Sequence, residues 1–144
     1  MKTYYHFLKH TLENYGGDFD RVILYLPEMF KLLCDVLEQN LEPQARAYIN
    51  AALAYFIRPN DLIPEDLYGP AGYIDDLFIC TSVIRYLIET IGIARLEPLW
   101  SHEEDFAPVI EMAWQKSYAV MAQQGLLAAA VEMTGLPLCQ GTPE

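Results

Sequence analysis

Several carboxylates stand close together in one short segment, and carboxylates are the side chains that bind divalent cations or transfer protons. The segment "FIRPNDLIPEDLYGPAGYIDD", residues 56–76, contains Asp61, Glu65, Asp75 and Asp76. Hard cations such as Mg²⁺ and Ca²⁺ take oxygen ligands from residues of this kind. A cation bound there could activate a water molecule for hydrolysis. These four residues are therefore the candidate ligands of a metal site.

The same carboxylates also fit a structural role. Asp75 and Asp76 fall in the first turn of an expected helix, where the helix dipole and the open amides stabilise negative charge. Asp61 suits an Asx turn to the amide of Ile63, and Pro64 stiffens the path that follows. Repulsion among close carboxylates must be relieved by a cation, by protonation or by water. The residue pattern leaves the metal site and the structural role both open.

No recognised catalytic set accompanies these carboxylates. The chain has no Gly-x-Ser-x-Gly, no phosphate-binding loop and no paired-cysteine motif. His6 and His10 have the spacing of a metal-binding pair, but Lys9 lies on the same helix face, which favours a solvated surface. We expect no catalytic residue, and no cofactor unless the carboxylates bind Mg²⁺ or Ca²⁺. A non-enzymatic protein is therefore favoured over an enzyme.

The net charge excludes one class of partner. Twenty acidic residues against nine basic ones give a formal charge of −11. Binding to phosphates needs clustered Lys and Arg, and no two of these residues are adjacent here. We therefore expect no nucleic acid partner, and the same charge balance disfavours docking on anionic lipid.

Cysteine usage and the N-terminal sequence indicate a cytoplasmic protein. Three cysteines have no paired spacing and are expected to be reduced thiols: Cys34, Cys80 and Cys139. The first residues lack the pattern of a signal peptide, so export is not expected. The most apolar stretch, residues 77–94, contains Arg85 and Glu89 on one face, which predicts an amphipathic helix and no transmembrane segment.

Apolar residues recur at helical spacing along most of the chain, so helices are expected throughout. The run "RVILYL", residues 21–26, would suit a strand by composition, but no other segment could pair with it. Ser101 and Glu104 form a capping-box pattern that predicts a helix start there, and Gly135 predicts a helix end. The expected helices cover about residues 4–15, 27–37, 43–57, 73–92, 101–123 and 126–134.

A chain of 144 residues fits one domain with one core. We predict an all-α fold, a compact bundle of five to seven helices over residues 1–135, followed by a disordered tail at 136–144. The two central helices, about 43–57 and 73–92, are expected to be joined by a docked linker rich in Pro and Asp.

Aromatic residues near the C-terminal end suggest a surface for a partner. Trp100, Trp114 and Tyr118 lie in or next to a segment that is apolar on more than one face, and Trp and Tyr are enriched at interface centres. Core packing is the more ordinary explanation of the same residues. A protein partner or a homodimer is the expectation from this segment.

The segments "AALAYFIRPNDLIPE" and "GYIDDL" resemble the core motif of the YkvA-like family, small helical proteins of unknown function. In that motif a Pro-x-Asp-Leu-Ile-Pro-Asp/Glu turn joins two helices, and Gly-Tyr-x-Asp-Asp opens the second. The matching positions are Tyr55, Pro59, Asp61, Leu62, Ile63, Pro64, Glu65, Gly72, Tyr73, Asp75 and Asp76. The resemblance covers about residues 45–90. Arg58 departs from it, because a small polar residue is expected there.

The resemblance implies a helical fold and no activity. It also carries a hint of association with a membrane surface, because several relatives are joined to hydrophobic segments. From all these features we expect a non-catalytic interaction or scaffold domain. The alternative is a divalent-cation-binding protein, including a metal-dependent hydrolase, that uses the carboxylates of residues 61–76.

Overall fold

The computed structural model describes residues 21–56, 74–101 and 103–136 of the 144-residue chain. Within these ranges the chain forms helices and no strand, so the predicted all-α class is confirmed. The 3-10 helices are η1 (Arg21–Tyr25), η3 (Ile93–Arg95) and η4 (Glu97–Leu99). The α-helices are α2 (Leu26–Val36), α3 (Pro43–Phe56), α5 (Ile74–Ile91), α6 (Phe106–Gln123) and α7 (Leu127–Thr134). The helix expected at 4–15 and the linker at 58–72 lie outside the described residues.

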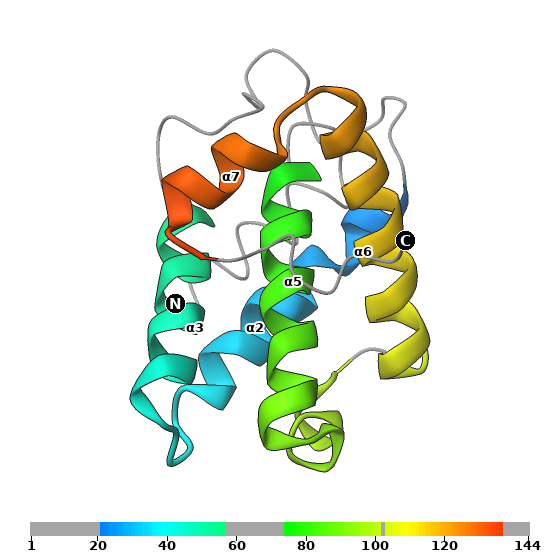
Figure 1. The fold of residues 1–144 in the computed structure, drawn as a ribbon. Helices are drawn as coiled ribbons and strands as arrows, with labels where there is room; N and C mark the ends of the chain where they lie inside the picture. The colour runs from blue at the N-terminus through cyan, green and yellow to red at the C-terminus, as the bar shows by residue number, and fades with distance from the viewer. Residues whose placement is uncertain (1–20, 57–73, 102, 137–144) are drawn as a thin grey trace.

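Helix α5 is the centre of the bundle. Figure 1 shows α3 along one side of α5 and α6 along the other, while α2 crosses behind and α7 lies across one end. The first eight residues of α5, Ile74–Thr81, are all buried, whereas a helix on the surface of a bundle buries one stripe. The apolar character of this segment on most of its sides therefore predicted its central position.

Several helix ends follow from local signals in the sequence. Pro43 begins α3, and Pro27 lies in the first turn of α2, where a missing amide hydrogen costs nothing. The run "RVILYL" forms η1 and the first residue of α2, as expected for a helical segment. Gly135 ends α7 with a left-handed φ of 74°, and its amide donates to the carbonyl of Val131 at 2.8 Å.

The predicted capping box at Ser101 and Glu104 is wrong. Helix α6 begins later, at Phe106, and Asp105 in the capping position makes no side-chain hydrogen bond to the helix. The carboxylate of Glu104 accepts a hydrogen bond from Tyr25 at 2.5 Å instead, and the Glu104 carbonyl accepts one from the Trp100 indole at 2.8 Å. The Glu104 carboxylate is thus bonded to a residue 79 positions away and does not cap α6.

Two arginines fix the connection between α2 and α3. Arg46 donates to the carbonyls of Leu37 and Gln39, both at 3.1 Å, and Arg95 donates to the carbonyl of Asn40 at 3.1 Å. The last carbonyls of a helix have no partner within the helix and need donors of this kind. Arg95 therefore holds this connection against the segment that follows α5.

None of the helices in the described part of the chain is by itself both long and apolar enough to cross a membrane. Taken together, α5 and the segment Ile93–Leu99 reach the required length and composition, but the two are bent by 113° at the break between them.

Candidate functional site

The carboxylates of Asp75 and Asp76 lie where the end of α3 meets the start of α5. The Tyr55 hydroxyl donates a hydrogen bond to Asp75 Oδ2 at 2.7 Å, and the Asp76 amide donates one to Asp75 Oδ1 at 3.0 Å. The relative exposure of Asp75 is 0%, that of Asp76 is 1% and that of Tyr55 is 1%. All three side chains are thus sealed from solvent, and Asp75 links the two helices.

Two buried carboxylates need compensation, because moving a charge out of water is costly. Both Asp75 and Asp76 occupy the first turn of α5, where the helix dipole favours negative charge. Cys80 lies one turn further along α5, close enough for the charge of Asp76 to act on its thiol. Burial raises the pKa of the Cys80 thiol well above its ordinary value, and the negative charge of Asp76 raises it further.

The structure places Asp75 and Asp76 in the first turn of a helix, at the position that the sequence predicted for them. Within the described ranges, no group of three or more His, Cys, Asp and Glu side chains is arranged to hold a metal ion. The remaining candidate residues of the motif and of the metal site lie outside the described residues: Pro59, Asp61, Pro64, Glu65, Gly72 and Tyr73.

The predicted interface residue Trp114 lies in the core between α5 and α6, with 1% exposure. Its ring stacks on Tyr118 with centroids 5.0 Å apart, and Phe78 lies 6.5 Å from Trp114 and 6.2 Å from Tyr118. The Trp114 indole donates to Ser82 Oγ at 3.1 Å. Its position matches the core-packing alternative that the sequence left open.

Arg85 lies over the face of the Trp114 ring. Its guanidinium carbon lies 3.8 Å from the centroid of the Trp114 ring, and its Nε donates to Glu111 at 2.8 Å. Trp100 and Tyr118 are half-buried. On α6, Met112 is the large apolar side chain left exposed in the described part, at 37%.

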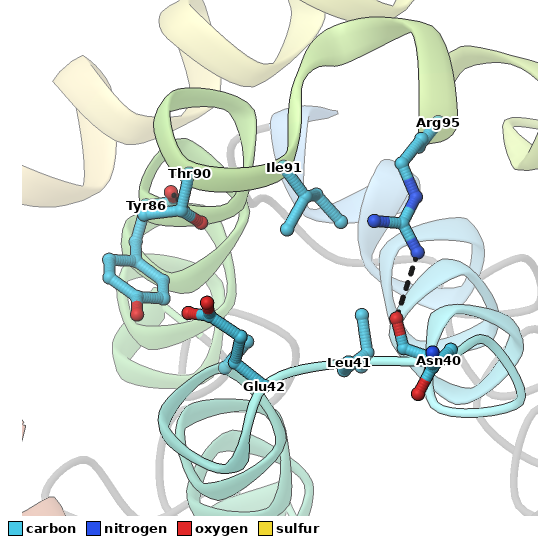
Figure 2. Close-up of a pocket in the computed structure, with 8 residues that line it drawn as sticks. Asn40, Leu41, Glu42, Tyr86, Thr90, Ile91 and Arg95 are labelled. Carbon is cyan, nitrogen blue, oxygen red and sulfur yellow. Dashed lines mark hydrogen bonds between the residues drawn. The ribbon is translucent and has the colours of Figure 1, made fainter.

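A pocket of about 250 Å³ opens between the α2–α3 connection and the C-terminal end of α5 (Figure 2). Its polar lining includes Glu42, Tyr86, Thr90 and Arg95. The ring of Tyr86 also contacts Tyr48, with centroids 4.2 Å apart. Burial raises the pKa of the Tyr86 hydroxyl, and the neighbouring Tyr48 and Glu42 raise it further.

Sequence reasoning missed this pocket because it has no local motif. Glu42 directly precedes α3, whereas Arg95 belongs to η3, the 3-10 helix that follows α5. The sequence shows only one charged residue next to each of two helix boundaries: Glu42 before α3, and Arg95 after α5. Such residues are ordinary at helix ends, so the pattern alone gave no reason to bring them together.

Comparison with known proteins finds a family model and an archaeal relative whose descriptions state no activity. The family model "Protein of unknown function (DUF1232)" matches residues 45–81. The "Uncharacterized protein ORF9" of Methanothermobacter thermautotrophicus is 34% identical over 109 residues, which cover 75% of each chain. No solved structure matches the chain.

A second relative shares only a short stretch. The "E3 ubiquitin-protein ligase RNF170" of Xenopus laevis is 44% identical over 36 residues, which are 25% of this chain and 14% of the ligase. The matched family model falls inside the segment where we noted the resemblance to YkvA-like proteins, and that family name itself stays a prediction. The DUF1232 model matches residues 45–81, the segment that contains Tyr55, Asp75 and Asp76. By its likeness to ORF9 over 75% of each chain, the chain belongs to the family of that archaeal protein.

Proposed function

We propose that this protein is a non-catalytic interaction domain in which the motif carboxylates hold α3 against α5. The observation that carries the proposal is the burial of Asp75 and Asp76, at 0% and 1% exposure. A group that reacts with a substrate or exchanges a ligand has to be reached from solvent, and ligand sites are concave and open to it. Two sealed carboxylates, one of which, Asp75, accepts a hydrogen bond from Tyr55, fit a structural role better.

The partner in this proposal is a second copy of the chain, and the surface is the outer side of α6. This helix carries one acid and one base, Glu111 and Lys116, in a chain whose net charge is −11. Two copies can approach through α6 without the repulsion that other acidic surfaces would cause. Met112 is exposed on α6, and Met is enriched at interfaces where charged residues are depleted.

The relative from Xenopus laevis adds support for a modular role. Its name describes an E3 ubiquitin-protein ligase, and the shared stretch accounts for 14% of its length. Sequence of this kind therefore also occurs as a small part of a much longer protein. Its occurrence there fits a segment that contributes packing or binding contacts, while catalysis is carried out by other parts of the longer protein.

Light scattering after size exclusion tests self-association. The unmodified protein should have about twice the 16.5 kDa mass of one chain. At the same concentration, the Met112→Glu variant should have the mass of a single chain. Asn50→Glu, which adds the same charge at an exposed position of α3, is the matched control and should remain dimeric. A single-chain mass for the unmodified protein at high concentration would refute the proposed partner.

The second candidate function is a divalent-cation site, with or without hydrolysis. It is supported by the two carboxylates at consecutive buried positions, Asp75 and Asp76, together with Asp61 and Glu65 from outside the described residues. Calorimetric titration with Mg²⁺ and Ca²⁺ checks it. Saturable binding that Asp75→Asn abolishes would favour the cation site over the interaction domain.

A further inference from the structure

The pocket at the end of α5 presents opposite charges on opposite sides. In Figure 2 the carboxylate of Glu42 and the guanidinium of Arg95 enter from two sides, with Leu41 and Ile91 between them. In the described part of the chain, neither charge forms an ion pair with the other or with a third residue. A ligand with both charges could therefore satisfy both ends at once.

Arg95 is held in position before any ligand arrives. Its Nε donates to Gln39 Oε1 at 3.0 Å, its Nη2 donates to the Asn40 carbonyl at 3.1 Å, and its own carbonyl accepts from Gln39 Nε2 at 3.4 Å. Arginine has five N–H donors, so these contacts use two of them and fix the plane of the group. The remaining donors suit a carboxylate, which arginine binds through parallel hydrogen bonds.

The other end of the pocket offers acceptors suited to an ammonium group. Glu42 supplies a carboxylate, and Tyr86 supplies a hydroxyl. Thr90 Oγ1 donates to the Tyr86 carbonyl at 2.9 Å, which leaves the oxygen of Thr90 available as an acceptor. A primary ammonium has three donors and no acceptor. Glu42, Tyr86 and Thr90 together match that requirement.

The size and the apolar walls limit the ligand further. Ligand pockets for drug-sized molecules measure roughly 300 to 1,000 Å³, and this one measures about 250 Å³. Leu41, Ala45 and Ile91 provide the apolar wall against which a short aliphatic group could pack.

From these contacts we infer that the pocket binds a small zwitterion with one primary ammonium and one carboxylate, of the size of a free amino acid. The carboxylate pairs with Arg95, and the ammonium pairs with Glu42 beside the hydroxyls of Tyr86 and Thr90. The two charges of the ligand must be present together, because each matches only one end of the pocket. This inference is independent of the interaction surface on α6.

Isothermal titration with three probes tests the inference: glycine, L-valine and γ-aminobutyrate, which differ in side chain and in charge separation. We expect at least one probe to bind with a dissociation constant below about 1 mM. N-acetyl-L-valine and L-valinamide each keep one charge and should bind at least about tenfold more weakly than L-valine, because a hydrogen-bonded charge pair is lost. Binding by none of the three probes would overturn the inference.

Variants locate the site. Glu42→Gln should weaken the binding of the best probe by about tenfold, and it should also remove the preference for that probe over its N-acetylated form. Arg95→Lys, which keeps the charge and loses the planar fork, should weaken binding as well. Glu132→Gln removes an exposed carboxylate on α7 and is the matched control, with unchanged affinity expected. Equal affinity in Glu42→Gln, Arg95→Lys and the unmodified protein would contradict the assigned pocket.

Discussion

The hydroxyl of Tyr55 donates a hydrogen bond at 2.7 Å to the carboxylate of Asp75, which lies 20 residues further along the chain. This contact joins the last turn of α3 to the first turn of α5. Both residues lie in the segment matched by the DUF1232 model, so the matched part of the chain also fixes the packing of its central helices.

Replacing Tyr55 by Phe should lower the free energy of unfolding by about 1.5 to 3 kcal/mol, because a hydrogen bond to a buried charged group is removed. Urea denaturation followed by circular dichroism measures the change. Tyr48→Phe is the matched control on α3, since the Tyr48 hydroxyl takes part in an exposed hydrogen bond with Gln44 at 3.3 Å. The control should change stability far less, and equal losses in the two variants would contradict the role of the Tyr55–Asp75 bond.

Replacing Arg85 by Gln should cost about 1 kcal/mol, because the guanidinium leaves the face of Trp114. The other partner of Arg85, Glu111, has a side chain that is 51% exposed, so Glu111→Gln should change stability by less than about 0.5 kcal/mol. Urea denaturation of both variants compares the two contacts. A larger loss from Glu111→Gln would mean that the ion pair is the stronger contact of Arg85.

Replacing Gly135 by Ala should cost about 1 kcal/mol. The φ of Gly135 is 74°, a left-handed conformation that disfavours residues with a Cβ atom. An added Cβ would meet nothing within 4 Å, so the cost is conformational and not steric. Gly135→Asn should lose less, because Asn adopts this conformation more readily. Thermal unfolding measures both, and an Ala variant as stable as the unmodified protein would contradict this role for Gly135.

The buried thiol of Cys80 predicts a dependence of stability on pH. Because burial raises the pKa of Cys80, its thiol stays protonated in the folded protein at pH values where the unfolded chain loses the proton. The unfolded state then binds fewer protons, so the free energy of unfolding falls as the pH rises above about 8.5, by at most about 1.4 kcal/mol per unit for this group.

The check is the slope of unfolding free energy against pH between about 8.5 and 10. Cys80→Ala should flatten the slope, whatever its effect on stability at neutral pH. Burial also raises the pKa of Cys34, but this residue is only half-buried, so Cys34→Ala should flatten the slope less. Parallel curves for the unmodified protein and Cys80→Ala would show that Cys80 does not cause the effect.

Local signals in the sequence predicted much of the bundle. Proline at position 43 predicted the start of α3, and glycine at position 135 predicted the end of α7. The apolar character of residues 77–94 predicted the central helix correctly. Lys31 and Asp35, four residues apart in the sequence, form an ion pair at 2.9 Å, because one turn of α2 brings them together. Such features depend on residues close in sequence, so a pattern of spacing reveals them.

Contacts between distant residues were not predictable in the same way. Glu104 is bonded to Tyr25, 79 residues away, so its local pattern suggested a cap that does not form. Glu28 is a charged residue on α2 and is only 7% exposed, which its position in the helical pattern does not indicate. Tyr55 and Asp75 both match positions of the YkvA-like motif, but the motif does not show that they are bonded, because their bond depends on how α3 and α5 pack. The same reason explains why the pocket between Glu42 and Arg95 was missed.

The most direct measurement is thermal unfolding of the unmodified protein and of Asp75→Asn, each in chelator and each with Mg²⁺ or Ca²⁺. If Asp75 holds the two helices together, Asp75→Asn should be destabilised by about 1 to 3 kcal/mol in every condition, because an amide in place of the carboxylate loses one of its two acceptors. The cations should leave the unmodified protein unchanged. A rise of about 8 °C with a cation at a hundred times its dissociation constant, absent in Asp75→Asn, would contradict this role and establish a metal site.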